Sequence, residues 1–189
     1  NLIVPALMAG NSVLFKPSEE TPLVAQAYVE ALNEVLPDHL LQIIHGDGEQ
    51  GEALVESDID MIAFTGSQAT GKKIMAKAAG GLKRLVMELG GKDPLIVMAD
   101  ADLEQAARFA VASSFENSGQ MCISTERIYV DEKIAEAFEQ RVTEIASGYK
   151  VGPWDQEGVN IGPIINARQH AKIVTQLRDA EARGARILL

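Results

Sequence analysis

Short apolar segments alternate with longer helical patterns along the whole chain, and this alternation constrains the fold more than any other feature. The short segments are rich in β-branched or apolar residues, whereas the longer ones repeat apolar residues at helical spacing. Strands are predicted over residues 12–15, 41–44, 61–64, 84–87, 95–98 and 127–130, with a last strand after residue 183. Helices are predicted over residues 23–35, 49–56, 68–79, 102–115, 132–147 and 167–183. Strands joined by helical crossovers predict an α/β fold with a parallel sheet, which binds ligands beyond the carboxyl ends of its strands.

The pattern restarts after Gly90 and Gly91, which predicts two domains, residues 1–90 and 91–189. Asp102 is a natural N-cap for a helix of the second domain. The chain opens without an initiator Met or a signal-peptide pattern and closes on an apolar stretch, residues 185–189, with no terminating turn. We therefore expect an internal piece of a longer protein.

The composition excludes several classes of function. Lys and Arg number 17 against 27 Asp and Glu, a net charge of −10, so a general nucleic-acid binder is not expected. The apolar runs are too short for a membrane span. The three His residues lack metal-ligand spacing, so no metal site is predicted. A single Cys makes no intrachain disulfide, which favours a reducing compartment such as the cytoplasm.

The loop at residues 16–22 (KPSEETP) directly follows a predicted strand, where ligands of doubly wound sheets lie. Lys16 and Glu19 could hold the two hydroxyls of a ribose, one as donor and one as acceptor. The alternative is a solvated loop in which Ser18 or Thr21 caps the next helix.

Residues 64–67 (FTGS) close another predicted strand and open a helix. Gly66 lets a ligand approach the backbone, and Ser67 stands at the N-cap, so the helix N-terminus could bind a phosphate. An ordinary N-cap would use the same residues. The glycine-rich turn at residues 46–51 lacks the spacing of the usual dinucleotide fingerprint.

Two side chains are candidates for covalent chemistry and proton transfer. Glu88 stands between apolar residues at a strand end, so partial burial is expected to raise its pKa and make it a general base. The alternative is a Glu paired with a nearby Lys or Arg. Cys122 lies in a polar, glycine-containing turn, which favours a reactive thiol over a buried hydrophobic residue. A thiol adds readily to an aldehyde, and a carboxylate can activate the water that cleaves a thioester, so these parts suit aldehyde oxidation.

The chain resembles the NAD(P)-dependent aldehyde dehydrogenase superfamily over nearly its whole length. Six segments carry the resemblance, in the family's order: residues 5–11, 16–22, 64–67, 88–92, 119–122 and 161–163. The resemblance implies a Rossmann-like parallel sheet from the cofactor domain, followed by part of an α/β catalytic domain.

The resemblance also implies roles for individual residues. Cys122 would be the nucleophile and Glu88 the base that activates the deacylating water. Residues of the two ligand loops and of the strand after them would bind the cofactor. The ribose would be held by Lys16 and Glu19, with Ser18 beside them, and the pyrophosphate would lie against Thr65, Gly66 and Ser67. The path of the adenine and phosphates would be lined by Phe64 and Thr70, with Gly48 and Gly51 nearer the adenosine end. The nicotinamide site would be bordered by Leu89.

A carboxylate at Glu19 would repel a 2′-phosphate, so NAD is the expected cofactor, with NADP possible. The implied partners are a small aldehyde and further copies of the same chain, as a dimer or tetramer. The family's oxyanion Asn, upstream of the Lys16 loop, and its second ribose-binding Glu are not in this sequence. We therefore expect the 189-residue piece alone to be inactive.

Two other functions compete with hydrolytic aldehyde oxidation. A non-catalytic NAD-binding or structural protein could retain the same fold. An enzyme that transfers the acyl group to CoA could use the same nucleophile, but the presence of Glu88 argues against it.

Overall fold

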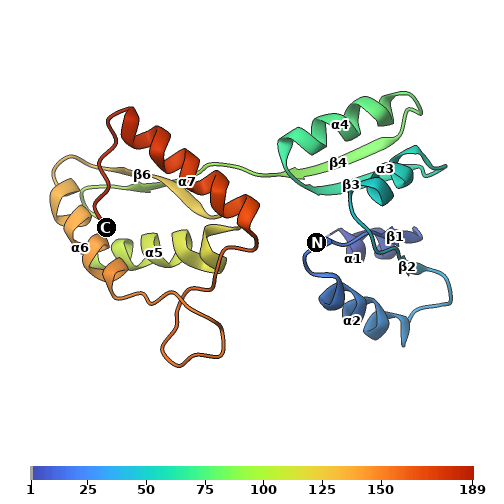
Figure 1. Cartoon of the computed structure of the whole chain (residues 1–189), viewed down its shortest axis with the longest axis horizontal. Coiled ribbons are helices and arrows are strands. Elements are labelled where there is room, and N and C mark those ends of the chain that lie inside the picture. The colour runs from blue at the N-terminus through green and yellow to red at the C-terminus, as the bar shows by residue number, and fades with distance from the viewer. Residues whose placement is uncertain (1) are drawn as a thin grey trace. The chain divides into compact units, whose positions relative to one another are not determined.

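The computed structural model describes residues 2–189, which form two compact units, Asn1–Leu89 and Gly90–Leu189 (Figure 1). The division falls next to the restart of the sequence pattern at Gly90. The fold class is α/β with parallel strands, as predicted.

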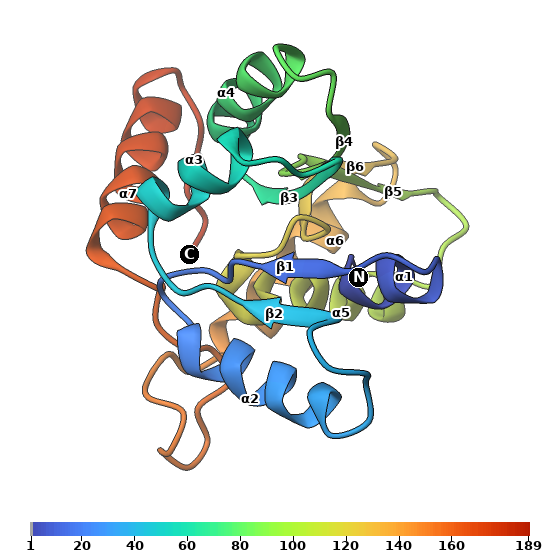
Figure 2. The same ribbon diagram turned by 90° about the vertical axis from the view of Figure 1, so that its right-hand side faces the viewer.

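Unit 1 consists of two β-α-β units joined by a helix. Its elements are α1 (Ile3–Met8), β1 (Val13–Phe15), α2 (Pro22–Asn33), β2 (Leu41–Ile43), α3 (Gly48–Glu56), β3 (Met61–Gly66), α4 (Gln68–Ala79) and β4 (Arg84–Leu89). Strand β1 pairs in parallel with β2, and β3 pairs in parallel with β4. Figures 1 and 2 show the crossover helices beside their strand pairs, α2 beside β1–β2 and α4 beside β3–β4.

The strands of unit 1 do not form the single sheet that the alternation predicted. Among the described residues, β1–β2 and β3–β4 are separate two-stranded sheets. A crossover helix returns the chain to the strand beside the one it left, so the sequence pattern specifies each local pair. Whether neighbouring pairs join depends on contacts between segments far apart in sequence, which periodicity does not encode.

The core of unit 1 lies between α3, α4 and the β3–β4 pair. Val55, Ile62 and Ala78 are buried there, and Phe64 and Leu85 pack against them. Burial of each large aliphatic side chain contributes roughly 1.5–3 kcal/mol, so this cluster fixes the α4–β3 geometry on which the phosphate-binding prediction depends.

Unit 2 is a third β-α-β unit followed by two more helices. Its elements are β5 (Asp93–Val97), α5 (Leu103–Phe115), η1 (Glu116–Gly119), β6 (Thr125–Val130), α6 (Ala135–Ser147) and α7 (Ala167–Ala182). Strands β5 and β6 are parallel. Ala107 and Ala110 of α5 pack with Val97 and Phe138, because their small side chains let the elements approach closely. Asp102 caps α5 as predicted, with its Oδ1 accepting from the Gln105 N–H at 2.9 Å.

Three local predictions differ from the structure. Residues 184–189 form no strand, because no described strand pairs with them. Helix α6 begins at Ala135 instead of residue 132, because Asp131 forms a turn in which its Oδ1 accepts from the Lys133 N–H at 3.0 Å. The short helices α1 and η1 were not predicted.

Candidate active site

Cys122 lies between η1 and β6. We call residues 116–124, which comprise η1 and the segment after it, the Cys122 loop. The Cys122 thiol is free and the residue is exposed. The alternative of a buried hydrophobic cysteine is therefore wrong. A thiol in this position can be reached by a reagent in solvent.

The backbone before Cys122 makes a left-handed turn. Asn117 (φ 50°, ψ 35°) and Ser118 (φ 61°, ψ 31°) have dihedral angles that side chains other than Gly rarely adopt, and Gly119 continues the turn at φ 70°. Each such residue other than Gly costs about 1–3 kcal/mol and persists only where its surroundings hold it. Strain of this kind is concentrated at functional sites, and here it ends at Gly119, with only Gln120 and Met121 between it and Cys122.

The junction between β4 and β5 lies against the Cys122 backbone. The Cys122 carbonyl oxygen is 3.4 Å from the position that a Cβ on Gly91 would occupy, and the Asp93 Oδ1 is 3.2 Å from it. A Cβ at position 91 would therefore touch the Cys122 carbonyl at ordinary contact distance and press only on the Asp93 side chain. Residue 91 thus lies next to the Cys122 loop, a proximity that the sequence did not reveal.

Ser124 is buried at 3% exposure, and its hydroxyl has no hydrogen-bond partner within residues 2–189. A buried, unsatisfied hydroxyl costs about 1–3 kcal/mol. We expect Ser124→Ala to raise the free energy of unfolding by about 1 kcal/mol, because the change removes that penalty and leaves only a small void.

Urea denaturation would measure this change. Ser147→Ala is the matched control, because the Ser147 hydroxyl donates to the Glu144 carbonyl at 2.7 Å in an exposed position. A loss of stability in Ser124→Ala, equal to or larger than that of the control, would contradict the prediction.

Glu88 lies at the carboxyl end of β4, opposite Thr65 of β3, and the next pair is Leu89 with Gly66. The β3–β4 register thus brings together four of the predicted site residues. Glu88 is exposed, so unit 1 does not provide the partial burial that the sequence predicted. Within residues 2–189 Glu88 forms no ion pair, and nearby Lys92 pairs with Glu126 at 2.6 Å. The alternative of an ion-paired glutamate is therefore wrong for the described residues.

Lys16 and Glu19 lie together in the loop after β1. The Lys16 Nζ is 3.9 Å from the Glu19 carboxylate and donates to the carbonyl oxygens of Pro17, at 2.7 Å, and Gly46, at 3.0 Å. The Lys16 stem passes over Gly51, with its Cε 3.5 Å from the position of a Cβ there. Three of the predicted cofactor residues, Lys16, Glu19 and Gly51, thus form one polar cluster.

Ser18 and Gly48 lie in the turns beside this cluster. The alternative in which Ser18 or Thr21 caps α2 is wrong: Thr21 stands at the N-cap but makes no side-chain capping bond. The Ser18 hydroxyl accepts from the Glu20 N–H at 3.2 Å, which shapes the loop itself. Gly48 is the first residue of α3 and has no neighbour within 4 Å of a Cβ built on it.

The N-terminus of α4 follows β3 directly and has the cap that was predicted. The Ser67 Oγ accepts from the Thr70 N–H at 3.2 Å and lies 3.0 Å from the Thr70 hydroxyl. Gly66 has φ +156°, and a Cβ there would lie 2.6 Å from the ring of Phe64. Phe64 itself packs on the buried cluster of unit 1. Its ring therefore covers the Gly66 backbone, and only glycine fits at this turn.

Leu89 packs against α4 through a second glycine. A Cβ on Gly71 would lie 3.0 Å from the Leu89 Cδ2, and Gly71 is itself buried in α4. This contact sets the separation between the end of β4 and the first turn of α4. Glu88, Leu89 and the capped helix N-terminus are therefore held in one fixed arrangement.

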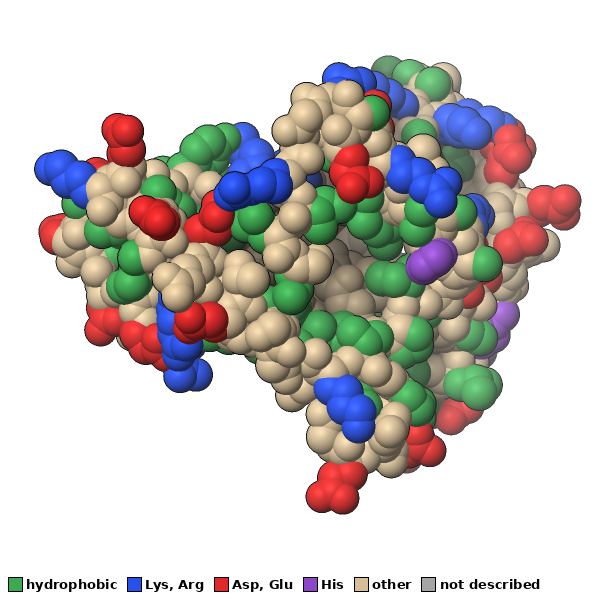
Figure 3. Space-filling model, turned by 60° about the vertical axis from the view of Figure 1, so that its left-hand side comes forward, with side chains coloured by type: hydrophobic (Ala, Val, Ile, Leu, Met, Phe, Trp, Pro, Cys, Tyr) green, Lys and Arg blue, Asp and Glu red, His purple; other side chains and the backbone are tan. Residues whose placement is uncertain are grey.

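Sites of two other kinds lack support in the described residues. Within residues 2–189, no group of three or more His, Cys, Asp or Glu side chains could hold a metal ion. No helix there combines the length and apolar character needed to cross a bilayer. The face drawn in Figure 3 shows acidic and basic side chains interspersed.

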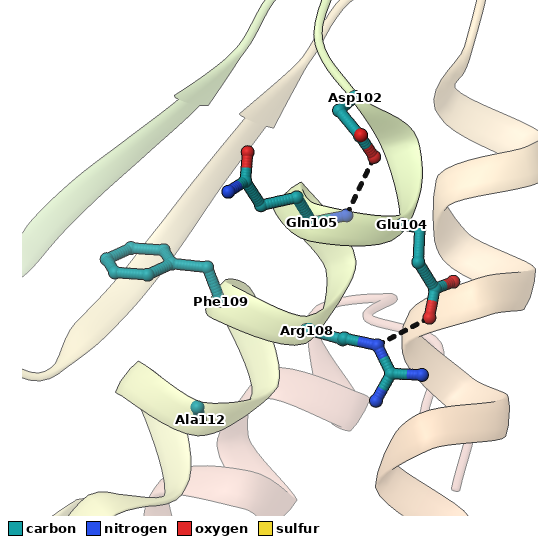
Figure 4. Close-up of a pocket in the computed structure, with 6 residues that line it drawn as sticks. All are labelled: Asp102, Glu104, Gln105, Arg108, Phe109 and Ala112. Carbon is teal, nitrogen blue, oxygen red and sulfur yellow. Dashed lines mark hydrogen bonds and ion pairs between the residues drawn. The ribbon is translucent and has the colours of Figure 1, made fainter.

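A surface hollow lies on the side of α5 (Figure 4). Its lining consists of Asp102, Glu104, Gln105, Arg108, Phe109 and Ala112. Arg141 and Arg108 donate hydrogen bonds to the Glu104 carboxylate and lower its pKa to about 2. The Arg141–Glu104 pair joins α6 to α5, so we interpret this hollow as part of the helix packing of unit 2.

Comparison with known proteins identifies the family. The model of the aldehyde dehydrogenase family matches residues 1–189. The chain belongs to the aldehyde dehydrogenase family. It is 43% identical over 186 residues to the betaine aldehyde dehydrogenase of Sinorhizobium fredii (strain NBRC 101917 / NGR234), which covers 97% of this chain and 38% of that enzyme. The chain therefore spans well under half the length of the curated relatives it matches.

Solved aldehyde dehydrogenase structures share its backbone. A lactaldehyde dehydrogenase superposes with a TM-score of 0.95 and 38% identity, over 100% of this chain and 40% of that one. The betaine aldehyde dehydrogenase of Staphylococcus aureus, in complex with NAD+, gives a TM-score of 0.94 and 35% identity over 99% of this chain and 38% of that one. The resemblance seen in the sequence is thus confirmed at the level of family and fold.

Proposed function

We propose that this chain supplies the nucleophile, the general base and the main cofactor-binding loops of an enzyme that oxidises an aldehyde to a carboxylic acid with NAD. The observation that carries the proposal is the free, exposed Cys122 thiol, which follows the strained turn at residues 117–119, in a chain that belongs to the aldehyde dehydrogenase family. An exposed Cys close to a strained turn fits a reacting group better than a packing residue.

In the proposed reaction the Cys122 thiolate adds to the aldehyde carbon and forms a thiohemiacetal. When bound, NAD supplies the acceptor for the hydride that leaves this carbon. The product on Cys122 is a thioester. Glu88 then takes a proton from a water molecule as that water attacks the thioester carbon, and the carboxylic acid departs while the Cys122 sulfur is restored. The balance is one aldehyde, one NAD and one water consumed for one acid, one NADH and one proton released.

The residues of unit 1 fit the cofactor that this reaction needs. The 12-residue helix α4 has Ser67 at its N-cap, and a helix N-terminus of this kind is suited to binding a phosphate. Lys16 and Glu19 offer a donor and an acceptor 3.9 Å apart, which matches neighbouring ribose hydroxyls. Leu89 lies beside Glu88 on β4, so the nicotinamide border and the base would share one strand end.

Two further features belong to the proposal. The active protein would be a homo-oligomer, a dimer or a tetramer, with a small aldehyde as substrate. A reducing compartment such as the cytoplasm would keep Cys122 as the thiol that the reaction requires. No nucleic-acid or membrane partner enters the proposal.

The decisive test is aldehyde-dependent NADH formation by the intact protein, with the products analysed in the presence and absence of CoA. Carboxylic acid formed without CoA supports the proposal. An acyl-CoA product that requires CoA would replace hydrolysis by acyl transfer. NAD binding without turnover of any aldehyde would favour the alternative, a non-catalytic protein that retains the fold.

Glu19 provides a test of cofactor choice. We expect Glu19→Gln to raise kcat/KM for NADP relative to NAD by about tenfold, because the change removes a carboxylate that repels the 2′-phosphate. Steady-state kinetics with both cofactors measure the ratio. Glu20→Gln is the matched control, since it removes the same charge one residue along the loop. An equal shift in both variants would mean that net charge, and not the position of Glu19, sets the preference.

A further inference from the structure

We propose that Gln120 and Ser118 are positioning residues that hold the Cys122 loop against residues 162–165, and that this segment is the support of the nucleophile. The proposal rests on the proposed function in one respect only, that Cys122 is the reacting thiol. The Ile161-Gly162-Pro163 motif has no role in the proposed reaction. The proposal gives it one, because Gly162 is bonded to the Cys122 loop.

Gln120 joins the turn to a segment 45 residues away in sequence. Its side-chain Nε2 donates to the Asn117 carbonyl at 3.1 Å, and its Oε1 accepts from the Ile165 N–H at 2.9 Å. The first bond closes the left-handed turn on itself. The second fastens the turn to the distant segment, so a single side chain does both.

Ser118 makes an independent connection to the same segment. Its hydroxyl donates to the Gly162 carbonyl at 2.8 Å, across 44 residues of sequence. The two connections lie on either side of Pro163, one at the Gly162 carbonyl and the other at the Ile165 N–H. Ser118 is also the residue with the least favourable backbone angles for its type in the turn.

Ile161, the residue before the 162–165 segment, is hydrogen-bonded to the loop that follows α6. The Ile161 N–H donates to the Lys150 carbonyl at 3.2 Å, and the Gly152 N–H donates to the Ile161 carbonyl at 3.0 Å. Next to Lys150, the ring of Tyr149 packs edge-on against Phe115 at the end of α5, with centroids 5.3 Å apart. The contacts thus form a closed path from α5, through the segment, and back to the Cys122 loop.

This arrangement acts on the thiol through the backbone. Cys122 is exposed and two residues from Gln120, so the direction of its Sγ follows the path of the loop and not side-chain packing. The left-handed turn is intrinsically unfavourable and would relax if its side-chain bonds were removed. Misplacement of a nucleophile by about 1 Å can lower the rate about 100-fold.

The test compares Gln120→Met, which keeps the side-chain length and removes both bonds, with Gln120→Glu, which keeps only the acceptor for Ile165. Gln140→Met on α6 is the matched control, since Gln140 bonds only to the exposed Glu144 at 3.2 Å. In Gln120→Met of the intact protein we expect faster amide hydrogen exchange confined to residues 116–124 and 162–165. We also expect kcat for aldehyde oxidation to fall about 10- to 100-fold with KM for NAD unchanged. Gln120→Glu should lie between Gln120→Met and the wild type.

A second readout is independent of turnover. Alkylation of Cys122 by iodoacetamide, followed by mass spectrometry of its peptide, should change in rate in Gln120→Met and in Ser118→Ala but not in Gln140→Met. If Gln120→Met fails to fold, Ser118→Ala and Gln120→Glu carry the same test.

The outcomes separate this inference from the proposed function. Unchanged exchange and alkylation in Gln120→Met and Ser118→Ala would overturn it, and so would faster exchange spread evenly over unit 2. The wild-type protein could oxidise no aldehyde while Gln120→Met still shows faster exchange confined to residues 116–124 and 162–165. The proposed function would then fail, and the positioning role of Gln120 and Ser118 would stand. Lower kcat with a matched rise in KM for NAD would also overturn it, because the defect would then lie in cofactor binding.

Discussion

Cys122→Ala is expected to abolish aldehyde-dependent NADH formation in the intact protein and to leave NAD affinity within about twofold of the wild type. The proposed route to hydride transfer needs a covalent adduct, because addition of the Cys122 thiolate converts the planar aldehyde carbon into the tetrahedral centre from which hydride leaves. The residues predicted to bind NAD all belong to unit 1, whereas Cys122 belongs to unit 2. Initial-rate assays and calorimetric titration with NAD measure the two quantities separately.

Cys122→Ser is the informative companion to this change. A hydroxyl is close in shape to the thiol but is almost fully protonated at neutral pH, so we expect a rate lower by about 1,000-fold or more. Ser113→Ala serves as the control, because it removes a hydroxyl from the adjacent end of α5 where Ser113 donates to Thr125 at 2.9 Å. Undiminished turnover in Cys122→Ala would refute the assignment of Cys122 as nucleophile.

Local sequence signals predicted a helix well where its ends have a capping side chain or a glycine that stops it. Helix α4 begins and ends where the pattern placed it, because Ser67 accepts from a first-turn N–H and the Gly80-Gly81 pair follows its last residue. The same holds for the start of α5 at its Asp102 cap. Helix α6 shows the limit of this reasoning, since its apolar repeat extends over a turn that the Asp131 side chain keeps non-helical.

Predictions that depended on distant partners fared less well. The strand expected after residue 183 has no described neighbour to pair with, and a strand exists only through its neighbour's hydrogen bonds. The role of Phe64 along the cofactor path stays a prediction, and the structure adds that this residue packs on the core with its ring over Gly66. An apolar residue at a strand end fits both roles equally well in a sequence.

The candidate site divides in the same way. Local motifs were enough to select Lys16, Glu19 and Ser67, because they follow strands at ligand-binding ends, and Cys122, because it lies in a polar, glycine-containing turn past a helix. The sequence predicted no role for Gln120 beyond its place in the 119–122 motif. Its contacts are with Asn117 in the same turn and with a backbone N–H 45 residues later. No periodicity or local motif encodes a contact of that kind.

Glu88→Gln is expected to separate the two halves of the reaction. The acylation half needs the thiol and NAD, so the variant should release about one equivalent of NADH per active site in a rapid burst. Turnover after the burst should fall by about 100- to 10,000-fold, because glutamine cannot take the proton from the attacking water. Rapid-mixing absorbance measures the burst, and mass spectrometry of the quenched protein detects the acyl group on Cys122.

A control and a chemical rescue make this prediction specific. Glu126→Gln removes a carboxylate that pairs with Lys92 at 2.6 Å, outside the proposed machinery, and should turn over normally. Hydroxylamine attacks thioesters without a general base, so it should restore turnover in Glu88→Gln and yield a hydroxamic acid. If the variant shows no burst, Glu88 acts before the thioester forms. If hydroxylamine fails to restore turnover although the acyl group has accumulated, the defect lies in access to the thioester. Either result would remove Glu88 from the role of deacylation base.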